Sequence, residues 1–182
     1  MRHPPTRSAF AGAHLVFYAA SASARGARHA RAVDCDGVRT AADAALASSS
    51  VRRLVLVSSQ LVHPRNTCSL IRCIINSCTT GCCAAGDDSL MSMKWRGEEL
   101  LREACQDSAA APAAPPAASD SAAAASSTMT YTIVRPGQLV DGAVRSVGAP
   151  RVGQCNASFM RGAASTRADV AGMVAEWVKR IR

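Results

Sequence analysis

The chain has 182 residues, of which 48% are hydrophobic and only 4% aromatic, and its formal net charge is +8. This length suggests one domain, and its core must be built mostly from Ala, Val, Leu and Ile. The arginines are scattered, whereas a nucleic-acid-binding protein more often clusters them on one face, so we predict no nucleic-acid partner. No apolar run approaches the roughly 18 residues of a membrane span, and none is predicted.

The N-terminal part of the chain has the composition of a transit peptide. Residues 1–33 contain five Arg, many Ala and Ser and no acidic residue. This composition hints at a chloroplast address, and without such an address we expect the protein in the cytoplasm. We expect residues 1–12 to be a disordered N-terminus and one domain to span residues 13–182.

The first predicted strand covers residues 14–19 (HLVFYA), a short apolar, β-prone run that ends in small residues. Residues 34–37 (DCDG) then predict a break between elements. A helix should follow, because apolar residues recur on one helical face at Val38, Ala42, Ala45 and Leu46. Residues 53–59 (RLVLVSS) form the clearest strand, whose continuous apolar run is typical of a strand covered on both faces.

A second helix is predicted from about residue 90 to residue 104, after an irregular segment at residues 60–90. Its apolar face consists of Met93, Gly97, Leu100, Leu101 and Ala104. Glu98 stands four residues before Arg102, so these two side chains are expected to form an exposed ion pair. The Ala, Pro and Ser residues at about 107–128 cannot bury enough surface to fold, which predicts a disordered insertion there.

The last part of the chain supplies one more strand and one more helix. Residues 130–134 (TYTIV) form the strand, which Pro136 and Gly137 end. The helix should begin near Thr166, which has capping-box spacing to Asp169. Its apolar face is formed by Val170, Met173, Val174, Trp177 and Ile181. The alternation of strands and helices predicts an α/β fold with a parallel sheet.

Five segments, in the right order, resemble motifs of one protein family. Residues 33–37 (VDCDG) resemble "VDxxG", and residues 54–59 (LVLVSS) resemble the "hhVhvSS" strand that follows it. Three later segments resemble "KxxGExxLR", "xYTIVRPGxL" and "xSRxDVAxxhhxxL", at residues 94–102, 130–137 and 165–171. The chain thus resembles the atypical short-chain dehydrogenase/reductase proteins, which are NmrA-like NAD(P)-binding domains, and in particular their plant and algal plastid-type branch.

The resemblance implies a Rossmann-like, doubly wound parallel sheet and a nicotinamide dinucleotide as cofactor. Members of the family open with a strand and a "TGAtGxxG" loop, whose amides and helix N-terminus hold the pyrophosphate. The segment before residue 14 contains no such loop. The sheet is therefore expected to be partial and to miss the first strands, roughly 60 residues at about 30 for each βα unit. We expect either NADP or NAD as cofactor, or none because the glycine-rich loop is absent.

The resemblance also assigns residues to a site. The cofactor-binding residues that it implies are Ala19, Ala20, Ser21, Ser58, Lys94, Pro136 and Gly137. Lys94 and Ser59 are the candidate catalytic residues. A typical member has a Tyr four residues before this Lys, and its phenol is the general acid/base. This chain has Leu90 in that place, which puts catalysis in doubt.

Cysteines gather in one segment of the chain. They are Cys68, Cys73, Cys78, Cys82 and Cys83. Zinc sites usually pair their ligands as C-x₂₋₄-C, and no partner pair stands elsewhere, so we predict free thiols and no metal site. Zinc binding with His63 as a further ligand and redox sensitivity of the thiols are the alternatives.

Two classes of function remain open. The first is an NAD(P)-binding protein that acts as an oxidoreductase or a nucleotide sensor. The second is a non-catalytic structural or interaction protein that retains the scaffold without cofactor, and an incomplete gene model of an intact relative is a third explanation of the missing loop. A sheet without its first strands exposes the edge of the strand at residues 14–19, so we expect a protein partner to cover that edge.

Overall fold

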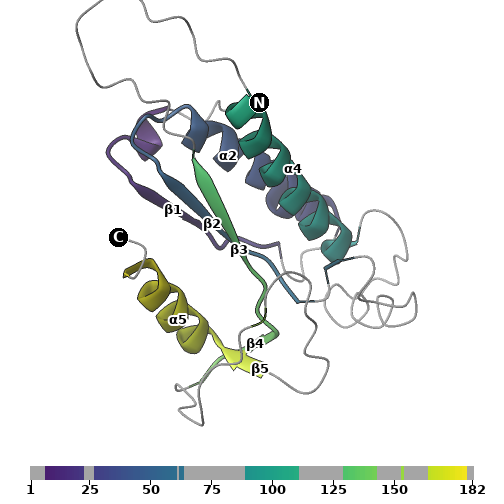
Figure 1. Cartoon of the computed structure of the whole chain (residues 1–182). Coiled ribbons are helices and arrows are strands. Elements are labelled where there is room, and N and C mark those ends of the chain that lie inside the picture. The colour runs from purple at the N-terminus through teal and green to yellow at the C-terminus, as the bar shows by residue number, and fades with distance from the viewer. Residues whose placement is uncertain are drawn as a thin grey trace, which may run out of the picture.

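The computed structural model describes residues 7–22, 27–60, 62–63, 89–110, 129–142, 153 and 164–179. Within these residues the fold is mixed α/β, with a parallel sheet of three strands, helices that cover it and a separate sheet of two strands (Figure 1). This is the class of fold that the alternation of elements in the sequence predicts.

The main sheet has the strand order β1-β2-β3, and all its strands are parallel. Its strands are β1 (Leu15–Tyr18), β2 (Arg53–Val57) and β3 (Thr130–Val134). The three predicted strands are therefore confirmed, and the central strand β2 has three buried residues in a row, as its apolar run predicted. Because the strands are parallel, their carboxyl ends meet at one edge of the sheet, where Tyr18 lies opposite Leu56.

Two long helical segments cover one face of the main sheet (Figure 1). The first begins with α1 (Ala27–Ala30), passes through the π-helix η3 (Arg31–Gly37) and ends with α2 (Val38–Leu46). The second is α4 (Leu90–Ala110), which packs along both α2 and η3. Both segments connect parallel neighbours in the sheet, as crossover helices do.

Residues 34–37 do not interrupt the chain as predicted, because they lie inside the helical stretch. Gly37 has helical backbone angles, φ −65° and ψ −39°, and Asp34 and Cys35 are buried. Asp and Gly favour turns in isolation, but packing against α4 stabilises the helical conformation here.

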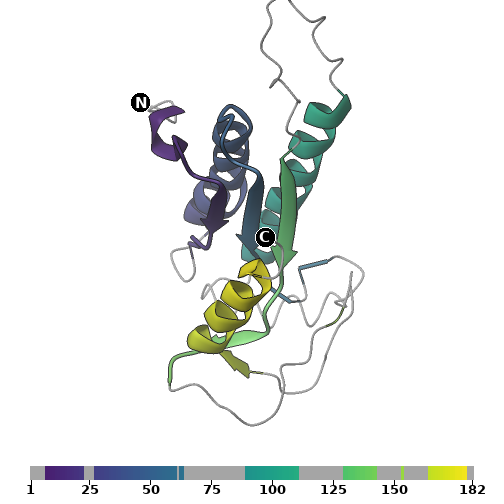
Figure 2. The ribbon, with the colours of Figure 1, turned by 60° about the vertical axis from the view of Figure 1, so that its left-hand side comes forward.

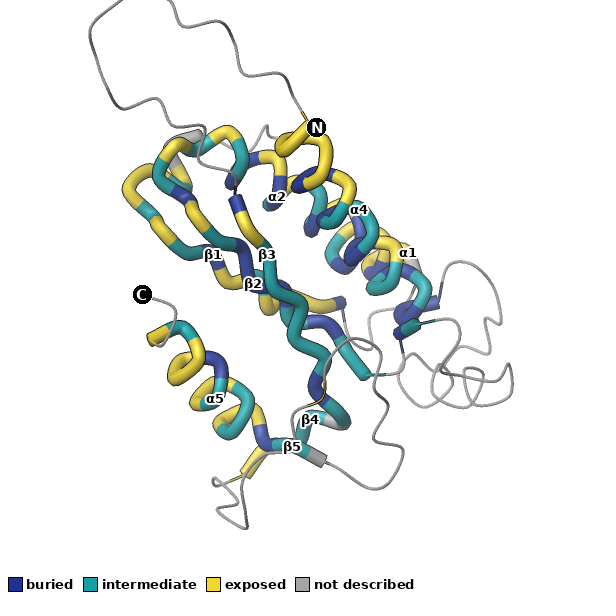
Figure 3. The backbone as a smooth tube through the Cα atoms, in the orientation of Figure 1, coloured by how far each residue is buried: buried dark blue, intermediate teal, exposed yellow. Residues whose placement is uncertain are grey.

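The core lies between the main sheet and the helices α2 and α4 (Figure 3). The predicted face of α2 is turned towards this interior, as are Leu101 and Ala104 of the predicted α4 face, whereas Met93 and Leu100 of that face belong to a second apolar cluster. As the composition indicated, the core is mainly aliphatic and alanine-rich. Its buried residues are Val16, Val38, Ala42, Ala45, Val51, Leu54, Leu56, Leu101, Ala104, Cys105 and Met129.

Helix α4 is longer than predicted, since it extends to Ala110 rather than ending near residue 104. Of the predicted disordered insertion, residues 107–110 are thus helical, and residues 111–128 lie outside the described residues. Among the helices of the described part, none is sufficiently long and apolar to cross a membrane.

The described part of the chain begins at residue 7, within the segment that the sequence predicted to be disordered. The short 3-10 helix η1 (Arg7–Phe10) begins there, and Phe10 packs against the core. The carbonyl oxygen of Phe10 also accepts hydrogen bonds from the hydroxyls of Ser48 and Ser50, both at 3.3 Å. These contacts fix the segment against the end of α2, while residues 1–6 lie outside the described residues.

Beyond β3 the chain forms a second parallel pair, which the sequence did not predict. Its strands are β4 (Gln138–Val140) and β5 (Ala164–Thr166), and helix α5 (Arg167–Lys179) follows directly. The predicted start of this helix is confirmed, because the amide of Asp169 donates a 3.0 Å hydrogen bond to the Thr166 hydroxyl.

Helix α5 lies on the side of the main sheet away from α2 and α4 (Figure 2). Trp177 on this helix stacks with the guanidinium of Arg53, whose Cζ is 5.5 Å from the ring centroid. Val174 is the buried residue of α5, whereas Trp177 remains 36% exposed and Phe17 on β1 49% exposed. The predicted apolar face of α5 is therefore only partly covered.

Candidate functional site

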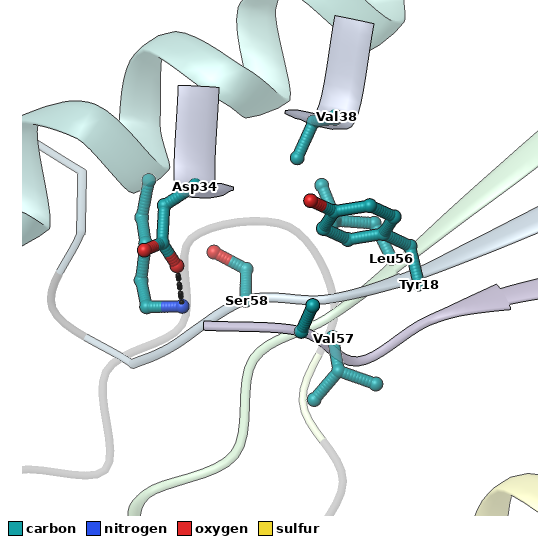
Figure 4. A pocket seen from close by; sticks show the side chains of 8 residues that line it. Tyr18, Asp34, Val38, Leu56, Val57 and Ser58 are labelled. Atoms are coloured by element: carbon teal, nitrogen blue, oxygen red, sulfur yellow. Dashed lines mark hydrogen bonds and ion pairs between the residues drawn. The ribbon is translucent and has the colours of Figure 1, made fainter. Parts of the chain in front are cut away.

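A small cavity lies where the strands β1 and β2 end (Figure 4). Its walls come from the two strand ends, from the helical stretch η3–α2 and from the second turn of α4. The cavity has a volume of about 10 Å³, which is room for about one water molecule. The lining residues are Tyr18, Ala20, Asp34, Val38, Leu56, Val57, Ser58 and Lys94.

A buried ion pair forms one wall of this cavity. The ammonium Nζ of Lys94 lies 2.7 Å from Oδ1 of Asp34, and the two side chains are 10% and 1% exposed. The other carboxylate oxygen of Asp34 accepts a 2.9 Å hydrogen bond from the amide of Ala22. The carboxylate is therefore compensated by one cation and one amide, as a buried charge must be.

The local sequence explains why these two side chains meet. Gly97 lies one turn after Lys94 on α4, and a Cβ at this position would overlap the backbone oxygen of Asp34. The missing side chain lets α4 lie directly on η3, which brings Lys94 to the carboxylate. Asp34 belongs to the π-helical segment η3, and such segments are rare and frequently occur at functional sites.

Ser58 supplies the unusual feature of the cavity. The residue is buried at the end of β2, and its amide donates a 2.8 Å hydrogen bond to the carbonyl of Val134. Its hydroxyl Oγ, however, has no hydrogen-bond partner among the described residues, and Figure 4 shows it near the Asp34–Lys94 pair. Leaving such a buried polar group unpaired costs about 1–3 kcal/mol. The adjoining cavity has room for one water or one small polar group of a ligand to pair with this hydroxyl.

Tyr18 is the phenol nearest to Lys94, but it is not suited to give up a proton. Its hydroxyl donates a 2.7 Å hydrogen bond to the carbonyl of Val33, in space that Gly37 leaves open by lacking a Cβ. Burial, and then the negative charge of Asp34, raise the pKa of Tyr18 above its ordinary value. The phenol therefore stays protonated at neutral pH.

The structure brings together some of the residues that the sequence predicted for the site. Ser58, Lys94 and Ala20 all line the cavity. Ala19 and Ser21 flank Ala20 in the exposed segment after β1 and do not line it.

The other predicted residues lie beside the cavity rather than in its walls. The hydroxyl of Ser59 donates to the carbonyl of Gln60 at 3.2 Å. Pro136 is buried just after β3, where its carbonyl accepts the amide of Gln60 at 2.8 Å, and Gly137 follows it. These two segments are thus tied to one another next to the site.

Asp34 and Tyr18 are the two site residues that the sequence interpretation did not assign. Asp34 stands inside the "VDxxG" segment, so the resemblance marked its position without a role. It is separated from Lys94 by 60 residues, and a separation of that size carries no spacing signal. Tyr18 could have been suspected, because it ends a strand at the carboxyl edge of the sheet.

A second polar cluster surrounds Glu98 on α4, one turn beyond Lys94. The Glu98 carboxylate is completely buried and accepts hydrogen bonds from Arg102 at 3.0 Å and from Nε of Arg135 at 2.9 Å. The predicted exposed pair of Glu98 with Arg102 is therefore wrong about exposure, because the chain after β3 brings Arg135 onto the carboxylate. Both guanidinium groups also lie over the ring of Trp95, at 5.3 and 5.8 Å.

Within the described residues no group of His, Cys, Asp and Glu side chains could hold a metal ion. The cysteine-rich stretch, residues 68–83, lies outside the described residues. Of the cysteines in the described part, Cys35 and Cys105 are buried free thiols, and burial is the main cause that raises the pKa of each. Buried thiols with a raised pKa are poor nucleophiles.

Comparison with known proteins adds nothing to this geometry, because no family model, no curated protein and no solved structure matches the chain.

Proposed function

We propose that this protein binds a nicotinamide dinucleotide, NADP or NAD, as an atypical short-chain dehydrogenase/reductase protein with a partial Rossmann-like sheet. The observation that carries this proposal is the buried hydroxyl of Ser58, which has no partner among the described residues and lies beside Lys94. In open α/β sheets, ligands bind outside the carboxyl ends of the parallel strands, and this hydroxyl stands at the end of the central one.

The residues at the cavity fit a ribose of such a cofactor. A lysine ammonium donates up to three hydrogen bonds, and a serine hydroxyl both donates and accepts, which matches the hydroxyls of a sugar. Lys94 and Ser58 would hold the ribose, with Ala19, Ala20 and Ser21 alongside. When bound, the nicotinamide ring would supply hydride transfer.

The same geometry favours a nucleotide sensor over a reductase. Carbonyl reduction by a Tyr–Lys pair needs a phenol with a lowered pKa, and the pKa of Tyr18 is raised instead. The chain has one other tyrosine, Tyr131, which packs against the core and does not line the cavity. Leu90 is buried at the position where the resemblance implies the catalytic tyrosine.

Titration of the purified chain with NADPH and NADH, followed by nicotinamide fluorescence, tests the proposal. We expect saturable binding of one or both, and Ser58→Ala should weaken it about three- to tenfold through the lost hydrogen bond. Ser50→Ala is the matched control, because its hydroxyl donates to the carbonyl of Phe10 and does not line the cavity, so its loss should leave the affinity unchanged. The absence of any binding up to millimolar concentrations contradicts the proposal.

A non-catalytic interaction protein is the second candidate, and the outer position of β1 in the sheet of the described residues favours it. β1 is an outer strand of the main sheet, and its Phe17 side chain is 49% exposed. A bare apolar edge strand invites pairing with a partner. If this second function holds, the chain should bind neither nucleotide, and Phe17→Asp should reduce its self-association or aggregation in light scattering.

A further inference from the structure

We infer that Tyr18 is a positioning residue, whose hydroxyl holds the segment η3 in its π-helical form and so keeps Asp34 in place at the cavity. The effect on η3 is a property of the fold, whereas the effect on ligand affinity rests on the proposed nucleotide binding. Three features of the described residues carry this inference: the hydrogen bond of the Tyr18 hydroxyl, the glycine that makes room for it, and the packing of η3 against α4.

The Tyr18 hydroxyl occupies a backbone acceptor of η3. It donates a 2.7 Å hydrogen bond to the carbonyl of Val33, and Figure 4 shows the phenol oxygen pointing from β1 towards the helical stretch. In an α-helix this carbonyl accepts the amide of Gly37, whereas in a π-helix each amide bonds to the carbonyl five residues before it. The phenol thus holds the acceptor that the α-helical form would need, which favours the π-helical form.

Gly37 makes the room that the phenol requires. A Cβ at this position would overlap the Tyr18 hydroxyl oxygen. Glycine is a poor helix former, and Gly37 has ordinary helical backbone angles, so a left-handed conformation does not explain its presence. The missing side chain is accounted for by the close approach of the phenol.

The position of η3 determines where Asp34 stands. Asp34 directly follows Val33, and its Oδ1 lies 2.7 Å from Nζ of Lys94. Gly97 on α4 approaches the backbone oxygen of Asp34 so closely that a Cβ would overlap it. A change of η3 to the α-helical form shifts its hydrogen-bond pairing by one residue. Because α2, which follows η3, is anchored in the core, that shift must move Asp34.

The affinity for the proposed ligand should then follow the population of the π-helical form. When only a fraction of the molecules has the binding-competent form, the apparent dissociation constant is the intrinsic one divided by that fraction. The ligand in turn shifts the population towards the form that it binds. A positioning role therefore predicts a loss of affinity together with a change in η3 that the ligand reverses.

Tyr18→Phe tests this role, because it removes only the hydroxyl. The backbone NMR signals of residues 31–37 should shift while those of β2 stay unchanged, and saturating nucleotide should move them back towards the wild-type positions. Fluorescence titration with NADPH and NADH should show about three- to tenfold weaker binding, which corresponds to one lost hydrogen bond. Unchanged signals of η3, or shifted signals that bound nucleotide does not restore, overturn the inference.

Tyr131→Phe is the matched control for Tyr18→Phe. It removes a phenol oxygen from a tyrosine that packs against the core and does not line the cavity. Both its η3 signals and its nucleotide affinity should equal those of the wild type. An equal loss of affinity in the two variants contradicts a specific role of Tyr18.

A double variant separates positioning from stability. Gly37→Ala should lower the midpoint of urea unfolding, because its Cβ overlaps the Tyr18 hydroxyl. Adding Tyr18→Phe removes that oxygen and leaves the nearest ring carbon at 3.5 Å, an ordinary contact, so the midpoint should rise again. Nucleotide affinity should not recover with it, because alanine favours the α-helical form. A double variant that is less stable than Gly37→Ala, or that regains wild-type affinity, overturns the inference.

The outcomes separate this inference from the proposed function. A wild-type chain that binds neither nucleotide contradicts the proposed function, while the η3 signals and the unfolding midpoint of the double variant still decide whether Tyr18 holds the π-helical form. A chain that binds nucleotide equally well with and without the Tyr18 hydroxyl retains the function and loses the positioning role.

Discussion

Helix α4 carries two buried ion pairs one turn apart. They differ in whether the polar side-chain atoms around each pair have hydrogen-bond partners. Around Glu98, the carboxylate accepts hydrogen bonds from both Arg102 and Arg135 and is entirely buried. Around Lys94, the pair with Asp34 lies against a cavity in which the Ser58 hydroxyl has no partner among the described residues. The first cluster is saturated, whereas the second retains an unused polar atom.

This difference indicates a division of roles along one helix. The bonds of Glu98 to Arg135 fasten the chain after β3 to α4, and the carbonyl of Val134, next to Arg135, accepts the amide of Ser58. The saturated cluster thus fixes the distance between the strand end that carries Ser58 and the helix that carries Lys94. We therefore expect the Glu98 cluster to serve stability, whereas the cavity one helical turn away is the place where the proposed function puts the ligand.

Removing the Glu98 carboxylate should have the largest effect on stability. Glu98→Ala leaves the guanidinium groups of Arg102 and Arg135 without their common counter-ion, which costs about 3–5 kcal/mol for a buried pair. Urea unfolding followed by circular dichroism measures the loss. Asp43→Ala breaks the exposed pair with Arg39 and should cost less than about 1 kcal/mol. Comparable losses in the two variants contradict the structural role of the cluster.

Gly97→Ala should push α4 away from the helical segment η3, on which it packs. The added Cβ would overlap the backbone oxygen of Asp34, so α4 must move away from η3, at a cost of about 1–3 kcal/mol. The same replacement at Gly172 on α5 meets no atom within 4 Å and should stabilise the chain by about 0.5–1 kcal/mol. Thermal melts of both variants should therefore shift in opposite directions.

Most of the main sheet could be predicted from the sequence, because its strands are short runs of apolar and β-prone residues. β3 begins and ends where predicted, at Thr130 and Val134, and the cap of α5 is where the Thr166 spacing placed it. The pair β4–β5 escaped prediction, because three-residue strands carry no periodic signal.

The burial of individual charges could not be predicted. Glu98 and Arg102 show the spacing of an exposed helix pair, and only the approach of Arg135 from 37 residues away turns that face into the interior. Asp34 was not assigned to the site for the same reason, because its contact with Lys94 joins residues 60 positions apart in the sequence. Lys94 and Ser58, in contrast, were found through short motifs, and the fold brings them to one cavity.

Alkaline pH should lower the free energy of unfolding of the chain through Tyr18. Its pKa is raised in the folded chain above the value of 10.0 that it has when unfolded. As pH rises through 10.0, the unfolded chain releases the proton first, so the stability present below that pH is progressively lost. Tyr18→Phe removes this loss. The pKa values of Cys35 and Cys105 are also raised, but both proteins share that contribution. Parallel stability curves for the two proteins between about pH 9 and 11 contradict the assignment.

The smallest expected change is in the free energy of unfolding when either of two buried serines is replaced by alanine. Ser89 is 5% exposed, and its hydroxyl accepts the amide of Ser92 at the start of α4. Ser89→Ala should therefore lower the free energy of unfolding by about 1 kcal/mol. Ser58 is 6% exposed, but its hydroxyl has no partner among the described residues. Ser58→Ala should leave the free energy unchanged or raise it by up to about 1 kcal/mol, because no hydrogen bond is lost.

Urea unfolding of the two variants decides whether the comparison between the clusters holds. Both substitutions remove one hydroxyl from a serine of nearly equal burial, so the volume lost is the same and the difference reports the hydrogen bond. A loss at Ser58 as large as that at Ser89 means that the Ser58 hydroxyl serves the fold. The cavity beside Lys94 would then be as saturated as the cluster around Glu98. An increased stability instead means that this hydroxyl is kept at the expense of stability, as residues reserved for a ligand commonly are, and an unchanged stability means that the hydroxyl makes no net contribution to the fold.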